Sequence, residues 1–373
     1  MTRVVLNGRF LTQRGTGVQR YARESLTALD ELLPRLPDER LEIVLAVPAD
    51  AVCPPLRNIT IAKLSGLRGH LWEQVQLPLY ARGDLLVNFN YSGPIAKRRQ
   101  LITIHDATVR AMPECFSPRY RLVQDALIAL LQSRVAGLMT VSEFSARELA
   151  LHYGIKRRIA VGREGWSHAL ATGDTEAVLA RYGLEAGKYL LLVGSLKPNK
   201  NLGVVARALE QAPVPWTVAV AGESDGRIFR DACQTGEQLK MLGYVPDEDL
   251  GALYTHAAWL LFPSLYEGFG LPALEAMANG CPVIAAHAGS LPEVCGDAAL
   301  YFDPRDAGAL SALLAGPARD VALRERLRLA AARRLAHYTW EANARIVLGE
   351  ILAVLGLPDL DAPMPQMSVG DVS

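Results

Sequence analysis

Short apolar runs alternate with helix-forming segments along most of the chain, and this alternation restricts the fold more than any other feature. In the first half, strands are expected at 4–6, 41–47, 85–89, 101–104 and 138–141. The segments between them predict helices at 17–33, 70–80 and 119–136, and a further helix that Ser142 caps and that ends at His152. Strands that alternate with helices in this way form parallel sheets covered by helices. The pattern therefore predicts an α/β protein.

The same order begins again after residues 169–177, which we interpret as a linker. Strands are expected at 190–193, 216–221, 240–242, 258–262 and 283–285, and helices at 201–211, 229–235, 247–256 and 272–278. A chain of 373 residues is long enough for two domains, which we assign to 1–170 and 171–340. A last helix is expected over 342–355. Residues 358–373 contain few apolar side chains and are expected to be disordered.

The stretch 263–282, PSLYEGFGLPALEAMANGCP, carries the strongest functional signal. Gly268 and Gly270 allow a tight turn between a buried strand and a helix. The free amides at the start of that helix favour a phosphate or another anion. Glu275, one turn into the helix, is in reach of the diol of a ribose, and Glu267, on the turn, is in reach of sugar hydroxyls. Ligands of α/β sheets bind at the carboxyl ends of the strands, so this position favours a binding site over a solvated loop.

This stretch resembles the E-x7-E signature of the retaining glycosyltransferases of family 4, which have the GT-B fold. The resemblance implies two Rossmann-like domains that face each other across a cleft, the first for the acceptor and the second for a nucleotide sugar. It also implies that the last helix, 341–357 here, crosses back to the first domain. Glu267 would then contact the donor sugar and Glu275 the ribose. The backbone that meets sugar and phosphate would be that of Gly268, Phe269, Gly270 and Leu271.

The loop GSLKPNKN, residues 194–201, also lies between a predicted strand and a predicted helix. Lys200, beside the helix N-terminus that Asn201 would cap, could neutralise a diphosphate. The resemblance implies that Lys200 grips the donor diphosphate and stabilises the departing nucleotide. Many family members carry Arg where Ser195 stands here. Either Lys197 substitutes for that Arg, or the amides after Gly268 carry more of the charge.

Two further loops are expected at the cleft. Gly15 and Gly17 let the backbone of the loop 14–20 come close to a ligand. The resemblance places this loop near the donor phosphates and the acceptor. His105 ends the predicted strand 101–104, and in the family a His at the matching place contacts the donor sugar. Asp106, the next residue, is a second and less strongly supported candidate for the same site.

Three other segments carry residues of the kinds found at such sites. Tyr244 and Val245 resemble the segment whose backbone contacts the nucleotide base. Glu164 stands where the family often has Asn, so no role is transferred to it. The acidic run Asp247-Glu248-Asp249 has the spacing of a metal-binding D-x-D string, but it stands at a predicted helix start, where acids favour the helix dipole. No metal site is therefore expected, and Lys200 and helix dipoles would replace the metal.

The two halves of the chain differ in charge. Residues 1–170 hold 23 Lys and Arg against 15 Asp and Glu, a balance of +8, whereas residues 171–373 hold 16 against 24, a balance of −8. Either the first domain faces an anionic membrane or a diphosphate-linked acceptor, or its arginines are scattered over a solvated surface. Arg119, Arg121 and the run 97–99 are the basic clusters expected to reach a membrane. No nucleic-acid motif accompanies the charge, so nucleic acid is not an expected partner.

Composition also bears on where such a protein works. No apolar run approaches the roughly 20 residues of a membrane span. The five cysteines are scattered and show no C-x-x-C spacing, which fits a reducing compartment. A cytoplasmic protein, peripheral on the inner face of the cell membrane, is the expectation.

Together these features predict a retaining hexosyltransferase with no cofactor, in which His105, Lys200 and Glu267 are the catalytic residues. It would move a hexose from a nucleotide diphosphate sugar to a lipid-linked or polysaccharide acceptor in the synthesis of a cell-surface glycan. By analogy the donor is a GDP-sugar, with GDP-mannose the best candidate. Two alternatives stay open: a sugar-nucleotide epimerase on a similar fold, and a non-catalytic nucleotide-binding partner subunit, which Ser195 favours.

Overall fold

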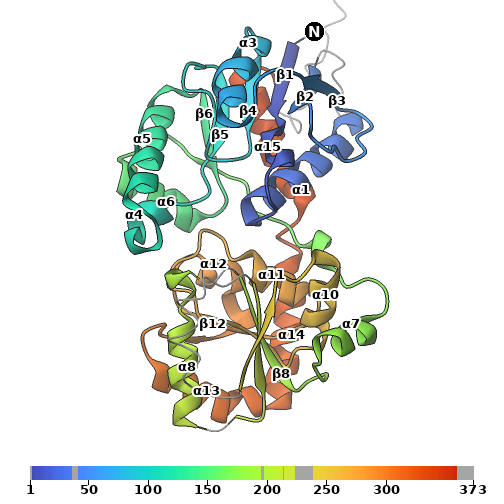
Figure 1. The fold of residues 1–373 in the computed structure, drawn as a ribbon, viewed down its shortest axis with the longest axis vertical. Coiled ribbons are helices and arrows are strands. Elements are labelled where there is room, and N and C mark those ends of the chain that lie inside the picture. Colours follow the sequence, from blue (N-terminus) through green and yellow to red (C-terminus); the bar gives the residue numbers. More distant parts are fainter. Residues whose placement is uncertain (1, 36–40, 195–196, 213, 223–237, 359–373) are drawn as a thin grey trace, which may run out of the picture.

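The chain forms two parallel β-sheets that follow one another in the sequence, each covered by helices (Figure 1). The computed structural model describes residues 2–35, 41–194, 197–212, 214–222 and 238–358. The sequence predicted an α/β fold with two successive halves, each built of alternating strands and helices, and this fold is confirmed. The predicted helix 229–235, Ser195 and most of the predicted tail 358–373 lie outside the described residues.

The first sheet has seven strands in the order β3-β2-β1-β4-β5-β6-β7. They are β1 Thr2–Asn7, β2 Leu41–Pro48, β3 Thr60–Leu64, β4 Leu85–Asn88, β5 Gln100–Thr103, β6 Gly137–Thr140 and β7 Ala160–Val161. The helices of this half are α1 Gly17–Leu32, a helical stretch made of α2 Gly69–Leu71, a π-turn at Trp72–Gln76 and α3 Leu77–Tyr80, then α4 Thr108–Ala111, α5 Pro118–Arg134 and α6 Glu143–Tyr153. Of the described strands here, only the two at the sheet edges, β3 and β7, are absent from the sequence prediction, because β3 is largely exposed and β7 has two residues.

The second sheet has six strands in the order β10-β9-β8-β11-β12-β13. They are β8 Tyr189–Val193, β9 Thr217–Ala221, β10 Leu239–Gly243, β11 Trp259–Phe262, β12 Val283–Ala286 and β13 Ala299–Phe302. Its helices are α7 Thr175–Tyr182, α8 Leu202–Gln211, α10 Asp247–His256, α11 Leu271–Ala278, α12 Leu291–Cys295, α13 Ala307–Ala315 and α14 Val321–Leu335. The central strands β8 and β11 are almost fully buried, as expected for parallel strands covered on both faces. The elements after β12 have no counterpart in the sequence prediction, except for the last helix.

The last helix, α15 Trp340–Leu355, crosses back to the first half and packs against α1 (Figure 1). Val347, Leu348 and Ile351 of α15 are fully buried in the core over the first sheet. Asn343 adds polar contacts there, because it accepts a hydrogen bond from Ser25 Oγ at 2.8 Å and donates one to the carbonyl of Gly162 at 2.9 Å. The predicted crossing helix is therefore confirmed.

The two halves meet at the carboxyl ends of their strands. Ser142 Oγ and Ser145 Oγ, at the start of α6, both donate to the carbonyl of Gly268 in the second half. The carboxylate of Glu293 accepts from the backbone amides of Glu143 and Phe144, each at 2.9 Å. These contacts bring the loop after β11 against the first half. Among the described residues, no helix is both long enough and apolar enough to cross a bilayer.

Candidate active site

The turn between β11 and α11 lies where the two sheets face each other. Gly270 has φ +101°, and a Cβ there would come within 2.7 Å of Leu291 Cδ2. A Cβ on Gly268 would come within 2.8 Å of Asp106 Cβ and 3.1 Å of the His105 carbonyl oxygen. Both glycines are therefore needed: Gly270 for its backbone conformation, and both Gly268 and Gly270 for close packing. The predicted strand, turn and helix are all present.

Lys200 and Glu267 form an ion pair at this turn. Lys200 Nζ lies 2.5 Å from Glu267 Oε1, and the two side chains are 15% and 14% exposed. Asn201 holds the lysine loop in place: it has φ +54° and donates to the carbonyls of Pro263 at 3.1 Å and Pro304 at 2.7 Å. Two predicted catalytic residues are thus in contact, although they are far apart in the sequence.

Glu275 lies on α11, almost fully buried, and both of its carboxylate oxygens are hydrogen-bonded. Tyr254 OH donates to Oε2 at 2.8 Å, and His168 Nε2 lies 3.0 Å from Oε1. Trp340 Nε1 donates to His168 Nδ1 at 3.1 Å, so the proton of a neutral His168 ring lies on Nε2 and points to Glu275. The sequence did not point to these three neighbours of the site: His168 lies on the turn Ser167–Ala169, Tyr254 on α10 and Trp340 on α15.

A small cavity opens beside Glu275. It is lined by Arg20, His168, Ala169, Asp247, Leu250, Gly251, Tyr254 and Glu275. Arg20 on α1 forms an ion pair with Asp247 on α10, so this cavity lies between the two halves. Glu275, which the sequence predicts to bind a ribose, therefore lines a small cavity that residues of both halves enclose.

His105 follows β5 and is buried. Its Nε2 lies 2.9 Å from the Phe89 carbonyl oxygen, and its ring packs edge-on against that of Tyr21 at 4.8 Å. Burial lowers the pKa of His105, which favours the neutral ring. The Asp106 side chain makes a local hydrogen bond, in which its Oδ1 accepts from the Thr108 amide at 2.7 Å. The packing of Gly268 against this strand end brings His105 close to the Glu267 turn.

Glu164, to which the sequence assigned no role, is a third acid of this region. Its side chain is buried, and burial together with the charges of Glu275 and Glu267 raises its pKa to about 8. A carboxyl group with such a pKa is mostly protonated at neutral pH and can donate a hydrogen bond. That Glu164 is near enough to Glu275 and Glu267 to feel their charges was not visible from sequence spacing.

The remaining predicted residues lie around this centre. Gly15 and Gly17 frame the start of α1, and the neighbouring Arg14 guanidinium lies 5.6 Å from the ring centroid of Tyr244. Tyr244 is exposed and Val245 is buried. Lys197 Nζ lies 5.3 Å from the ring centroid of Phe116, so this lysine reaches toward the first half.

The acidic run at the start of α10 is engaged in ion pairs. Asp247 pairs with Arg20, and Asp249 Oδ2 lies 2.6 Å from Arg181 Nη1. Across the described ranges, no group of three or more His, Cys, Asp and Glu side chains is arranged to hold a metal ion.

Comparison with known proteins identifies the family. The model of the glycosyl transferases group 1 matches residues 176–334. The O-antigen chain mannosyltransferase B of Escherichia coli is 34% identical over 272 residues, which cover 68% of this chain and 70% of that protein. The O-antigen chain mannosyltransferase RfbU of Salmonella typhimurium is 26% identical over 326 residues, 81% of this chain and 87% of that protein. The serotype-specific mannosyltransferase WbdA of Escherichia coli is 28% identical, but the match spans only 28% of its length.

Solved structures agree on the fold. A sucrose-phosphate synthase from Thermosynechococcus elongatus superposes with a TM-score of 0.72 at 19% identity, over 95% of this chain and 99% of that one. Anabaena Alr3699/HepE in complex with UDP and glucose gives a TM-score of 0.68 at 18% identity, over 95% of this chain and 100% of that one. The expected GT-B arrangement is thus confirmed. The chain belongs to the glycosyl transferases group 1 family and is a glycosyltransferase.

Proposed function

We propose that this protein transfers mannose from GDP-mannose to a hydroxyl of a lipid-linked or polysaccharide acceptor, with retention of configuration, in the synthesis of a cell-surface glycan. The choice of mannose is supported by its relatives, three of which are named mannosyltransferases, two of them of O-antigen chains. The observation that carries the proposal is the contact of Lys200 with Glu267 at the turn where the two halves meet.

In this proposal the Lys200–Glu267 pair separates when the donor binds. The ammonium group of Lys200 and the free amides at the start of α11 neutralise the diphosphate, and the Glu267 carboxylate accepts hydrogen bonds from sugar hydroxyls. His105, held neutral by burial, lines the sugar pocket without adding charge. No metal takes part, because the lysine and the helix dipole stabilise the charge on the leaving diphosphate.

The chemical step then needs no protein nucleophile. The bond from the anomeric carbon to the diphosphate oxygen breaks, and the acceptor hydroxyl oxygen forms its bond to that carbon on the same face of the sugar. The proton of the acceptor hydroxyl passes to the departing diphosphate. Lys200 is placed to stabilise the negative charge that develops on that leaving group.

Glu275 is proposed to accept hydrogen bonds from the ribose diol. Tyr254 and His168 hold its carboxylate at 2.8 and 3.0 Å and so act as positioning residues for the nucleotide. Because Glu275 already has two donors, a ribose would bond to its remaining lone pairs or displace one of these neighbours.

A peripheral position on an anionic membrane is the second part of the proposal. Helix α5 exposes apolar side chains to solvent, with Leu122, Val123 and Leu130 73%, 60% and 40% exposed. Arg119, Val123 and Leu130 stand at helical spacings of four and seven residues and so share one face. A helix face that combines apolar and basic side chains is suited to the headgroup region of an anionic bilayer. A lipid-linked acceptor would be presented there.

Transfer assays test the proposal directly. Purified protein is incubated with radiolabelled GDP-mannose or UDP-glucose and with octyl mannoside or octyl mannobioside as acceptors, with and without a chelator. Mannosylated product with the anomeric configuration of the donor, formed equally with chelator, is the expected result. A chelator-sensitive reaction would overturn the metal-free mechanism, and product from UDP-glucose alone would overturn the choice of donor.

Two other outcomes would point to the alternatives. A new sugar nucleotide formed without any acceptor would identify an epimerase. Tight GDP binding without turnover on any acceptor would identify a non-catalytic partner subunit.

A further inference from the structure

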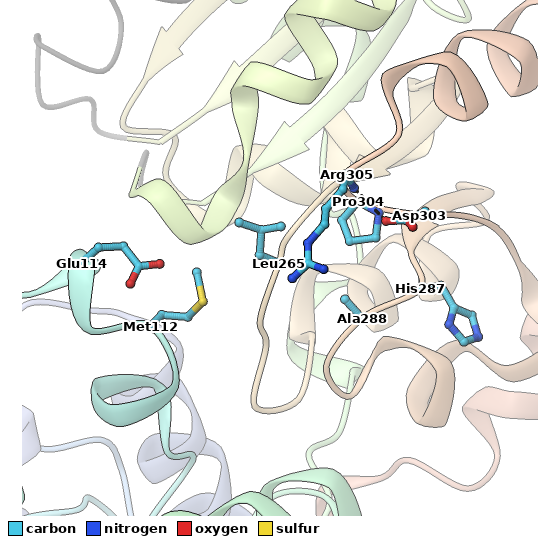
Figure 2. A pocket seen from close by; sticks show the side chains of 8 residues that line it. All are labelled: Met112, Glu114, Leu265, His287, Ala288, Asp303, Pro304 and Arg305. Carbon is cyan, nitrogen blue, oxygen red and sulfur yellow. Dashed lines mark hydrogen bonds between the residues drawn. The ribbon is translucent and has the colours of Figure 1, made fainter.

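A second, larger cavity lies between the two halves, and it shares no lining residue with the small cavity beside Glu275. Its volume is about 690 Å³, and it is lined by Met112, Glu114, Leu265, His287, Ala288, Asp303, Pro304 and Arg305 (Figure 2). Met112 and Glu114 come from the short segment between α4 and α5, and the other residues come from the loops after β11, β12 and β13. Cavities of about 300–1,000 Å³ are typical of small-molecule sites.

The wall of this cavity is fixed to the backbone of Glu267. Ser290 Oγ donates to the Glu267 carbonyl at 3.0 Å, and the Ser290 amide donates to the same oxygen at 3.2 Å. Gly289 has φ +60°, and a Cβ on it would lie 2.7 Å from the Glu267 amide nitrogen. Ala288 precedes this contact, and Leu265 stands two residues before Glu267, so the cavity borders the residue that is proposed to hold the donor sugar.

The lining of the cavity suits a carbohydrate. Figure 2 shows the Glu114 carboxylate and the Arg305 guanidinium pointing from opposite sides toward the space beside Leu265. Neither side chain forms an ion pair or a hydrogen bond with another residue in the described parts of the chain. One charged acceptor and one planar donor can bind vicinal hydroxyls, while Met112 and Leu265 can pack against the apolar face of a pyranose ring.

This cavity is also distinct from the small cavity beside Glu275, whose volume is about 10 Å³. Glu275, His168, Tyr254 and Arg20 line the smaller cavity, and none of them lines this one. The segment that carries Glu114 leads directly into α5, the helix proposed to meet the membrane. An acceptor that is presented at α5 would therefore reach the Glu267 turn through this cavity.

We propose that this cavity is the acceptor subsite, in which Glu114 and Arg305 bind the sugar residues next to the hydroxyl that receives mannose. The inference rests on the proposed transfer reaction and names the part of the acceptor that the protein recognises. It predicts that the protein recognises a glycan of at least two sugars, since the cavity is larger than one hexose requires.

The test compares Glu114→Gln and Arg305→Gln with matched controls, Glu210→Gln and Arg326→Gln, which change exposed charges outside the cavity. Transfer from GDP-mannose is measured on octyl mannoside, mannobioside and mannotrioside, and GDP affinity is measured by calorimetry. Wild-type protein and both controls should use the longer acceptors better than octyl mannoside. Each cavity variant should lose about tenfold or more in kcat/KM on the longer acceptors, the range expected for one charged hydrogen bond. GDP affinity should not change.

The outcomes separate this inference from the proposed function. Transfer with no preference for the longer acceptors, or with the same preference in both cavity variants, overturns the acceptor subsite and leaves mannosyl transfer intact. A loss of GDP affinity in Arg305→Gln assigns the cavity to the nucleotide and also overturns it. No transfer by the wild-type protein with any acceptor overturns the proposed function, on which the inference depends.

Discussion

At the scale of single residues, the central feature is that charged groups meet in pairs across loops that are distant in sequence. Lys200 and Glu267 neutralise each other, and Tyr254 and His168 hold Glu275. Such buried or half-buried partners keep the polar groups satisfied and hold them in one orientation. Each group is thus positioned by protein contacts before a substrate arrives.

Lys200→Ala should lower kcat by about 10²–10³, the effect of losing one preorganised group that stabilises charge in the transition state. The assay is transfer from GDP-mannose at saturating acceptor. Lys197→Ala serves as the matched control, because Lys197 lies on the same loop but reaches toward Phe116. Near-normal kcat in Lys200→Ala would remove this residue from the catalytic group, and an equal loss in Lys197→Ala would mean that both lysines hold the diphosphate.

Glu164 makes stability depend on pH. Its pKa rises from an ordinary 4.5 to about 8 in the folded protein, so between these values the folded state binds a proton that the unfolded chain has lost. The free energy of unfolding should therefore fall as pH rises from about 4.5 to 8, with a limiting slope of about 1.4 kcal/mol per pH unit from this group. Glu164→Gln should remove that part of the slope.

Urea unfolding of both proteins at pH 5, 6, 7 and 8 measures the effect. The variant should gain stability relative to wild type with each step in pH. A difference that stays constant across this range would contradict the raised pKa.

At the scale of elements, local pattern was sufficient for most of the fold. The strand, turn and helix from β11 to α11 were predictable because a short apolar run, two glycines and a proline follow one another there. Strand β3 was not, since its residues are mostly exposed and show no buried periodicity. The division of the chain into domains at 1–170 and 171–340 remains a prediction.

The candidate site was predictable where the signal was local and not where it depends on packing. Glu267, Glu275 and Lys200 each stand on a loop or helix that follows a buried strand. His168 contacts Glu275 across more than one hundred residues of sequence, and Trp340 at the start of α15 contacts His168, which no spacing in the sequence reports. The cavity lined by Glu114 and Arg305 needs three loops from different strands, so it too was invisible.

Helix α5 is the element that should bind membranes. The protein should sediment with vesicles that contain phosphatidylglycerol at low salt and remain largely in solution at high salt. Basic residues contribute about 1 kcal/mol each near an anionic surface, and salt screens that attraction within about 8–10 Å. Replacing Leu122 and Val123 by Glu should abolish sedimentation.

Leu329→Glu is the control for this experiment, because Leu329 is 58% exposed on α14 in the second half. Its sedimentation should match wild type. If the wild-type protein ignores the vesicles at low salt, the membrane proposal fails and a soluble acceptor becomes the better choice.

At the scale of the whole molecule, the carboxylate of Glu293 links the two halves. It accepts hydrogen bonds from two free amides at the start of α6, where a negative charge also favours the helix dipole. Glu293→Ala should weaken this contact by about 1.5–3 kcal/mol, as for hydrogen bonds to charged groups. The halves should then separate more readily, and the radius of gyration in small-angle scattering should increase.

Asp297→Asn is the matched control, since Asp297 lies one helical turn further along but pairs with Arg333 on the surface. Its scattering should equal that of wild type. An unchanged radius in Glu293→Ala would mean that the remaining contacts, such as those of Ser142 and Ser145 with Gly268, are sufficient to hold the halves together.

The return of α15 also determines the order in which the protein can be completed during synthesis. The ribosome makes the first sheet before the second, but Val347, Leu348 and Ile351, which cover one face of the first sheet, emerge only after the second sheet has been made. Through that interval Leu26 and Leu29 of α1 lack their apolar partners, so the nascent first half is exposed to aggregation and to chaperones. A chain that stops before Trp340 would lose the apolar side chains that α15 contributes to the core of its first half, even though every strand of that half had been made.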